Sequence, residues 1–201
     1  MKYMKIALTG GIACGKSEII QQFKTLGAGV ISLDKLSRDV VQVGESALNE
    51  LIDSFGNSIL YADQSLNRVA LREILLKNST NKQKIEAILH PKILEKMQIE
   101  IEKLNNKLII IEIPLLLEKK LAYLFDRAII VSCSAENQLK RLLKRQNIDN
   151  NTAKQLISVQ ISQEQQLELE KELPIDILEN NSEIFDLEKK VDTLYQKLIN
   201  L

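Results

Sequence analysis

Residues 6–17 read Ile-Ala-Leu-Thr-Gly-Gly-Ile-Ala-Cys-Gly-Lys-Ser. From Gly10 to Ser17 they hold the pattern Gly-x4-Gly-Lys-Ser, which between a strand and a helix forms a loop that cradles phosphate groups. A short apolar run comes directly before the pattern, and Glu18–Leu26 follows with apolar residues at helical spacing and Gly27 as a stop. The sequence therefore predicts a strand, a phosphate-binding loop and a helix, which together bind a nucleoside triphosphate.

The parts of this loop have separate chemical roles. Its glycines let the chain curl so that successive N–H groups face a phosphate chain, and the positive end of the following helix strengthens that field. Lys16 can reach the β and γ phosphates, and the Ser17 hydroxyl can bind Mg²⁺. The residues expected to contact the nucleotide are Gly11, Ile12, Ala13, Cys14, Gly15, Lys16 and Ser17.

The composition is that of an ordinary soluble globular protein. The chain has 201 residues, of which 45% are hydrophobic and 27% charged, enough for one α/β domain with insertions. Its 27 basic and 27 acidic side chains balance, so no overall charge attracts nucleic acid or an anionic membrane. Aromatic residues are only 4%, which disfavours a base-stacking surface. We expect no nucleic acid, no membrane and no obligate protein partner.

The two cysteines, Cys14 and Cys133, do not form a metal-binding pattern. Cys14 lies inside the glycine-rich loop, where we expect an oxidised or bulky group to obstruct phosphate. The sequence shows no signal peptide, and its apolar runs, such as Leu108–Ile111, are far too short to span a bilayer. These features predict a cytoplasmic protein with reduced cysteines.

Short β-branched runs alternate with helical patterns along the chain. Most of these runs are apolar without alternation, which is typical of parallel strands covered on both faces. The sequence therefore predicts an α/β protein with the three-layer P-loop NTPase fold, a five-stranded parallel sheet flanked by helices. Its core is expected in residues 1–34, 105–138 and 172–201. The predicted strands are Ile6–Thr9, Gly29–Ser32, Leu108–Glu112, Ala128–Ser132 and Ile175–Leu178.

A long helical interval separates the second and third predicted strands. It is about 75 residues long (33–107), whereas a crossover needs only a dozen or more. We interpret residues 35–104 as a helical substrate-binding insertion, with a helix break at Pro91. Its predicted helices are Leu48–Phe55, Asn67–Lys77, Asn81–Leu89 and Lys92–Leu104.

A second interval, residues 139–171, follows the fourth strand. It has a basic helical segment, a polar turn at residues 147–151 and a Gln/Glu-rich helix that is expected to run to about Leu169. Arg141 and Arg145 are four residues apart, so both lie on one helix face. The segment is interpreted as a lid over the phosphates, and a solvated helical hairpin is the alternative.

Three further side chains are candidates for chemistry. Asp34 follows the second strand at the carboxyl edge, where it can orient an acceptor hydroxyl or instead cap the next helix. Glu112 ends the third strand and can lie near a metal or be an exposed acid. His90, the only histidine, is expected to have a structural or substrate-facing role rather than to act as a general base.

Several of these pieces occur together in one known family. The chain resembles the dephospho-CoA kinases across essentially its whole length, and the His-Pro-x-Ile and Pro-Leu-Leu-x-Glu pieces together with the loop are the most specific part of the resemblance. The matching segments are Leu8–Ile12 with the loop, Val30–Arg38, Leu66–Arg68, Leu71–Arg72, Leu89–Ile93, Ile113–Glu118, Gln138–Leu142 with Arg145, and Ile177–Asn180.

The resemblance implies transfer of the γ-phosphoryl group of ATP, with Mg²⁺, to the ribose 3′-hydroxyl of dephospho-CoA, the last step of coenzyme A synthesis. It makes Asp34 the leading candidate to orient the acceptor hydroxyl, with Lys16 and Arg141 as the other catalytic residues. It implies that Arg141 and Arg145 face ATP and that Asn180 lies near the adenine. The residues implied on the acceptor side, besides Asp34, are Arg38, His90, Pro114 and Glu118.

The chain departs from the family pattern at three positions. Ser32 stands where the family often has a first acid, Ser182 where it often has glycine, and Cys14 where serine is common. Two other functions stay open from the residues: another nucleoside or nucleotide kinase of the same fold, which would differ in its acceptor, and a nucleotide-binding regulatory module. The presence of Lys16 and Asp34 with both lid arginines argues against the regulatory module.

Overall fold

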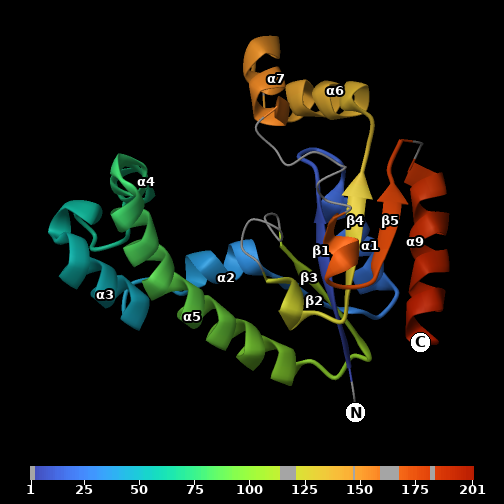
Figure 1. Ribbon diagram of the computed structural model, residues 1–201, viewed down its shortest axis with the longest axis horizontal. Helices are drawn as coiled ribbons and strands as arrows, with labels where there is room; N and C mark the ends of the chain where they lie inside the picture. The colour runs from blue at the N-terminus through green and yellow to red at the C-terminus, as the bar shows by residue number, and fades with distance from the viewer. Residues whose placement is uncertain (1–2, 114–120, 147, 159–167, 182–183) are drawn as a thin grey trace. The chain divides into compact units, whose positions relative to one another are not determined.

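A five-stranded sheet carries the candidate site (Figure 1). The computed structural model describes residues 3–113, 121–146, 148–158, 168–181 and 184–201. The strand order is β2-β3-β1-β4-β5, and the predicted parallel α/β fold is confirmed. The strands are β1 (Met4–Gly10), β2 (Gly29–Ser32), β3 (Leu108–Glu112), β4 (Arg127–Ser132) and β5 (Ile175–Glu179).

The central strand, β1, brings the phosphate loop to one edge of the sheet. It pairs in parallel with β3, where Leu8 is opposite Glu112, and with β4, where Gly10 is opposite Val131. Ile6 and Leu8 are completely buried. Because parallel strands end at the same edge, the chain leaves β1, β3, β4 and β5 beside one another, where ligands bind in such sheets.

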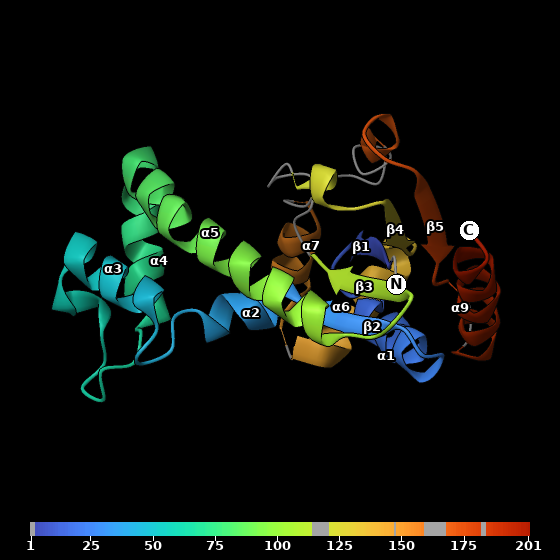
Figure 2. The ribbon, with the colours of Figure 1, turned by 90° about the horizontal axis from the view of Figure 1, so that it is seen from below.

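Two helices cover one face of the sheet. They are α1 (Lys16–Thr25) and α9 (Ile184–Ile199), which pack against each other (Figure 2). Ile19 and Phe23 of α1 join Leu187 and Val191 of α9 in one buried cluster with the inner face of β1. Amphipathic spacing in both helices produces this packing, and the cluster fixes the start of α1 beneath the loop.

The contacts within the chain divide it into two compact units. One comprises Met1–Ile31 with Leu104–Leu201, and the other is Ser32–Lys103. The second unit is helical and has its own core around Leu51, Ile59 and Ile85. Its elements are α2 (Leu33–Asp39), α3 (Ser46–Phe55), the 3-10 turn η1 (Asn57–Ile59), α4 (Arg68–Lys77) and α5 (Ser79–Lys103).

The predicted helix break at Pro91 is wrong. A single 25-residue helix, α5, runs through this proline. Proline inside a helix removes one backbone hydrogen bond and costs about 3 kcal/mol. Ile85 on one side of Pro91 and Met97 and Ile101 on the other are all buried. Burial of each such side chain contributes about 1.5–3 kcal/mol, so packing along the whole helix outweighs the local cost of the proline.

The predicted lid interval, residues 139–171, contains most of α6 (Ala135–Gln146) and all of α7 (Asn150–Ser158). Asp149 accepts hydrogen bonds from the Asn151 and Thr152 N–H groups and from the Thr152 hydroxyl, and so caps α7. The Thr152 hydroxyl is the main reason why the pKa of Asp149 lies below its ordinary value. Leu169, expected in a continuing α-helix, lies instead in the 3-10 turn η3 (Glu168–Lys171).

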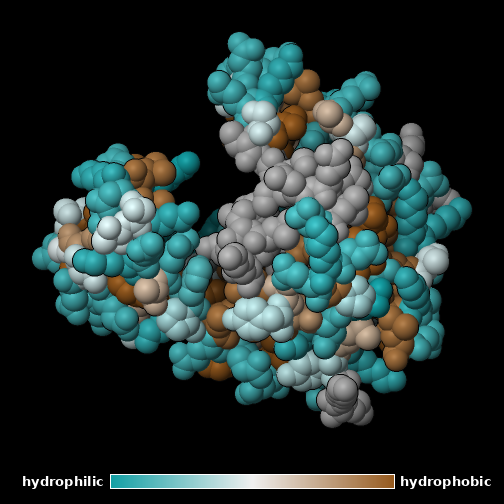
Figure 3. Space-filling view, viewed as in Figure 1, coloured by the Kyte–Doolittle hydropathy of each residue, from teal (hydrophilic) through white to brown (hydrophobic). Residues whose placement is uncertain are grey.

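The exposed large apolar side chains of the described residues lie on many different elements. The face in Figure 3 is mostly hydrophilic, with small apolar areas between polar ones. Across the described residues, every helix is too short or too polar to cross a bilayer. The exposed apolar side chains are Val43, Tyr61, Val69, Leu76, Ile99, Tyr123, Ile177 and Leu201.

Candidate functional site

The loop from Gly10 to Gly15 turns sharply between β1 and α1, and its glycines are required by close contacts. Gly10 and Gly15 have φ values of 143° and 93°, and Ala13 has a φ of 57°. A β-carbon at Gly10 would collide with the Val131 carbonyl, and one at Gly15 would collide with the Asn180 side-chain amide. The loop therefore follows a path that other residues resist at these two positions.

Replacing Gly15 with alanine is expected to damage both the fold and nucleotide binding. A left-handed conformation costs alanine about 1–2 kcal/mol, and the collision with Asn180 adds to that cost. Gly44→Ala is the matched control, because Gly44 has a φ of 94° and open space around the position of a β-carbon. Chemical denaturation should show a larger loss of stability for Gly15→Ala, and titration should show weaker ATP binding only for this variant. Equal losses in both variants would contradict the close packing of the loop.

The Lys16 ammonium lies against the loop itself. It donates hydrogen bonds to the carbonyl oxygens of Gly10 at 2.8 Å and Gly11 at 2.9 Å. Ser17 follows at the exposed start of α1, where the first N–H groups of the helix favour an anion. A phosphate oxygen offers the ammonium a charged acceptor in place of neutral carbonyls, and such bonds are about twice as strong.

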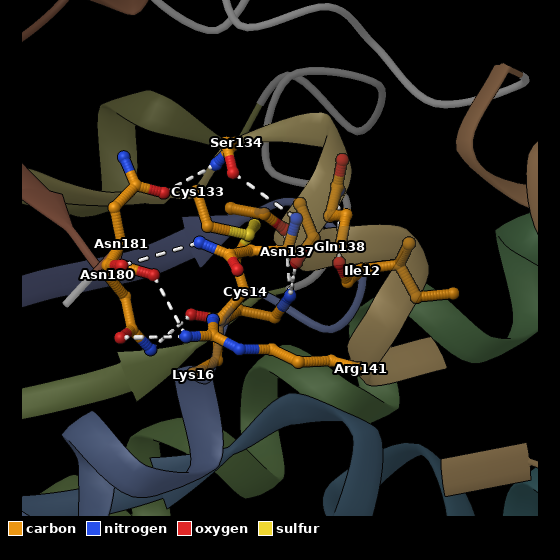
Figure 4. The surroundings of a disulfide bond; sticks show 12 residues. Ile12, Cys14, Lys16, Cys133, Ser134, Asn137, Gln138, Arg141, Asn180 and Asn181 are labelled. Carbon is orange, nitrogen blue, oxygen red and sulfur yellow. Dashed lines mark hydrogen bonds between the residues drawn. A yellow bond between two sulfur atoms is a disulfide. The ribbon is translucent and has the colours of Figure 1, made fainter. Parts of the chain in front are cut away.

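Side chains from α6 and from the end of β5 support the loop (Figure 4). Gln138 Nε2 donates to the Ile12 carbonyl at 3.0 Å, and Asn180 Nδ2 donates to the Cys14 carbonyl at 2.9 Å. Arg141 Nη2 donates in turn to the carbonyl oxygen of Asn180 at 3.0 Å and to its Oδ1 at 3.2 Å. Arg141 and Asn180, predicted on the nucleotide side, are thus joined to the loop by one chain of hydrogen bonds.

Gln138 is a loop-supporting residue to which the sequence analysis gave no role. It appeared only as part of a matching segment, although its position three residues before Arg141 places both on the same face of α6. Its amide lies 2.6 Å from where a β-carbon of Gly11 would be, so Gly11 makes room for it. Helical spacing from Arg141 is the signal that could have identified it.

One nitrogen atom of the Arg141 guanidinium can still bind a ligand. Its Nη1 atom is buried and, within the described part of the chain, has no hydrogen-bond partner. Leaving a buried donor unpaired costs about 1–3 kcal/mol, and more when it is charged. An anionic ligand at this position would remove that cost.

Cys14 and Cys133 form a disulfide, which contradicts the expectation that both are reduced. The two cysteines are separated by 119 positions in the sequence but are close in space, because β1 and β4 are neighbours and both cysteines lie beyond the ends of these strands. Cys14 is only 2% exposed and belongs to the core cluster beneath the loop. The Cys14 side chain packs in the core, and obstruction of phosphate by an oxidised group here stays a prediction.

Asp34 and Arg38 lie on α2, in the helical unit. Arg38 Nη2 is 3.5 Å from Asp34 Oδ2, and the Asp34 side chain is 63% exposed. The alternative that Asp34 caps the helix is wrong: Ser32 is the N-cap, and its Oγ accepts from the Lys35 N–H at 3.5 Å. Ser32, one of the departures from the family pattern, thus leaves the Asp34 carboxylate available for another role.

The other predicted site residues lie on α5, at the end of β3 or outside the described part of the chain. His90 is partly buried in the middle of α5. Glu112 is partly buried at the end of β3, directly opposite Leu8 of β1. Pro114, Glu118 and Ser182 lie outside the described residues, as does the side chain of Arg145. Among the residues that are described, no three His, Cys, Asp or Glu side chains gather as metal ligands.

Comparison with known proteins points to one family. The sequence model of the dephospho-CoA kinase family matches residues 4–186. A dephospho-CoA kinase of Fusobacterium nucleatum is 35% identical over 192 residues, covering 96% of this chain and 97% of its own. One from Vibrio parahaemolyticus is 33% identical, covering 96% and 94%. The solved structure of dephospho-CoA kinase from Campylobacter jejuni covers 98% of this chain and 97% of its own, with a TM-score of 0.68 and 28% identity.

Proposed function

The chain belongs to the dephospho-CoA kinase family, and from this premise we propose that it transfers the γ-phosphoryl group of ATP to the ribose 3′-hydroxyl of dephospho-CoA, forming coenzyme A. The observation that carries the proposal is the family match over residues 4–186, together with a loop whose glycines, Lys16 and helix α1 have the arrangement that phosphate binding requires. Enzymes that transfer phosphoryl groups act mainly by positioning the reactants and by neutralising charge. Separate residues bind the donor and the acceptor of the phosphoryl group.

The donor half of the reaction is assigned to the first unit. N–H groups of the loop and the start of α1 bind the β and γ phosphates, and the Lys16 ammonium exchanges its two carbonyl acceptors for phosphate oxygens. Arg141 Nη1 donates to the same phosphate chain or to the γ-phosphoryl group as it is transferred. Because these donors are already held by Gln138 and Asn180, little reorganisation is needed as charge moves in the transition state.

The residues present suit a magnesium ion that arrives with the nucleotide. Mg²⁺ keeps several water ligands and is usually held by one or two protein oxygens together with phosphate oxygens. The exposed Ser17 hydroxyl at the start of α1 fits that requirement, and Glu112 at the neighbouring strand end can bind one of the waters. When bound, the ion neutralises charge on the β and γ phosphates.

The acceptor half is assigned to the helical unit. Asp34 accepts the hydrogen bond of the ribose 3′-hydroxyl and takes its proton as the new bond to phosphorus forms. Its exposed carboxylate, free of any capping role, supports this assignment. Arg38 lies one helical turn away, with its Nη2 atom 3.5 Å from Asp34 Oδ2. We assign His90, Pro114 and Glu118 to binding of the rest of dephospho-CoA, and residues 35–104 to the acceptor domain.

Removing both lid arginines is expected to affect ATP more than the acceptor. For the double variant Arg141→Ala with Arg145→Ala, kcat/KM for ATP should fall about tenfold or more, because charge-assisted contacts to phosphate contribute about 1.5–3 kcal/mol each. The KM for dephospho-CoA should change little. The matched control is Lys140→Ala with Lys144→Ala, which removes two exposed charges from the same helix. A larger effect on dephospho-CoA than on ATP would place the arginines on the acceptor side.

A coupled assay with a panel of acceptors tests the proposed function. With ATP and Mg²⁺, we expect dephospho-CoA to have the highest kcat/KM in comparison with adenosine, AMP and pantetheine. Preference for a plain nucleoside would favour another kinase of the same fold, and ATP binding without transfer to any acceptor would favour a regulatory module. We place the activity in the cytoplasm, with no nucleic acid or obligate protein partner.

A further inference from the structure

The chain has only two cysteines, and the fold places both at its phosphate loop. Their Cα atoms are 5.3 Å apart, within the range that a disulfide requires, and the two sulfur atoms are bonded. Cys14 belongs to the loop, whereas Cys133 follows β4 directly and leads into α6. The backbone N–H of Cys14 belongs to the phosphate loop, but neither cysteine side chain has a role in the phosphoryl transfer described above.

The disulfide joins the loop to the strand beside it at a position that bears on its shape. The Cys14 N–H donates to the Gly11 carbonyl at 3.3 Å, and the Lys16 ammonium occupies the Gly10 and Gly11 carbonyls. In this conformation, donors that could bind phosphate are hydrogen-bonded to carbonyl oxygens of the loop itself. The N–H of Cys14 and two of the three donors of the Lys16 ammonium become available to phosphate only when they leave those carbonyls.

We propose that Cys14 and Cys133 form a reversible redox switch, in which the disulfide holds the loop in this self-bonded conformation and weakens ATP binding. A covalent link between the sulfurs restrains the backbone of Cys14, whose carbonyl is also held by Asn180. In the dithiol form, only packing and hydrogen bonds restrain the same residue. The inference concerns regulation of the nucleotide site and rests on the proposed function for its effect on catalysis.

The burial of the two sulfurs favours a disulfide that changes the conformation of the loop without filling the phosphate site. Cys14 is buried in the core cluster, so oxidation adds no atoms on the phosphate side of the loop. Cys133 is only partly buried and packs at the edge of that cluster. An oxidant can therefore reach Cys133 first, and Cys14 is close enough to complete the bond.

The oxidant is a low-molecular-weight disulfide, written RSSR. The Cys133 thiolate attacks one of its sulfurs, which forms a mixed disulfide and releases RS⁻. The Cys14 thiolate then attacks the Cys133 sulfur, which forms the internal disulfide and releases the second RS⁻. Two cysteine thiols have lost two electrons and two protons, and RSSR has become two RSH. A dithiol reductant reverses both steps.

The test compares the same protein in two redox states. Wild-type protein is equilibrated with dithiothreitol or with oxidised glutathione, the small thiols are removed, and intact mass confirms the loss of two hydrogens on oxidation. The Kd for ATP is then measured by titration, and the kinase rate is measured separately. We expect oxidation to raise the Kd for ATP about tenfold, a typical coupling between two states of a site. The reduced form should recover the lower Kd.

Two single variants serve as controls. Cys133→Ser keeps the loop sequence and Cys14→Ser keeps the β4 exit, and neither variant can form the internal disulfide. For each variant, the Kd for ATP is expected to be the same after reduction as after oxidation. The proposal is overturned if the internal disulfide does not form, if it forms without changing the Kd, or if Cys133→Ser responds as the wild type does. Tight ATP binding by reduced protein that phosphorylates no dephospho-CoA would instead refute the proposed function and leave the redox comparison intact.

Discussion

Replacement of Lys16 with alanine is expected to lower kcat/KM by about 10²–10⁴-fold. The ammonium has two neutral acceptors in the structure, the carbonyls of Gly10 and Gly11. In the reaction it meets the charged oxygens of the β and γ phosphates. Two charge-assisted contacts of about 1.5–3 kcal/mol each account for the expected loss, and the contribution increases as charge develops in the transition state.

Steady-state kinetics with ATP and dephospho-CoA measure this effect, and thermal unfolding checks the fold. Lys24→Ala is the matched control, because Lys24 is an exposed lysine in the last turn of the same helix, α1. The Lys16 variant should unfold at nearly the wild-type temperature, because the two hydrogen bonds that it loses to the Gly10 and Gly11 carbonyls lie within the loop. Near-normal activity of Lys16→Ala would refute the assignment of the loop as the phosphate site.

Replacement of Asp34 with asparagine is expected to lower kcat by about 10²–10⁴-fold if the carboxylate accepts the proton of the acceptor hydroxyl. The loss falls toward the lower end if the transition state is loose, because the carboxylate then mainly positions the hydroxyl. Asparagine keeps the shape of the side chain and removes its charge. Helix α2 should keep its stability, because its N-cap is Ser32.

Separate measurements of kcat and of the KM for each substrate show which step Asp34 serves. The control is Asp39→Asn at the other end of α2, which removes an acid from the same helix. We expect kcat to change strongly for Asp34→Asn and little for the control. A loss in kcat of less than tenfold would show that Asp34 is not the group that activates the acceptor.

The strands could be predicted from the sequence because each is short and rich in β-branched residues, and most are continuous apolar runs. The predicted Gly29–Ser32 and Leu108–Glu112 agree with β2 and β3 at both ends. Pro91 misled the prediction because the local cost of a proline is visible in the sequence, whereas the burial of Ile85 and Met97 on either side of it depends on the rest of the unit. Tertiary packing decided that helix.

The phosphate loop was visible in the sequence because all its parts are contiguous. The groups that support it are not: Gln138 and Asn180 come from α6 and the end of β5, 126 and 166 residues from their partners. The pairing of Cys14 with Cys133 has the same origin, since it follows from the position of β4 beside β1. The spacing of residues along a sequence does not show which strands are neighbours in the sheet.

The proposed function depends on the choice of acceptor, and the chemical structure of the product identifies that acceptor. Protein, ATP, Mg²⁺ and dephospho-CoA are incubated together, and the product is examined by phosphorus NMR and mass spectrometry. We predict one added phosphoryl group, with a phosphomonoester signal coupled to the ribose 3′ proton, in a product indistinguishable from coenzyme A. Phosphate at another position, or no transfer to dephospho-CoA by a protein that binds ATP, would contradict the account.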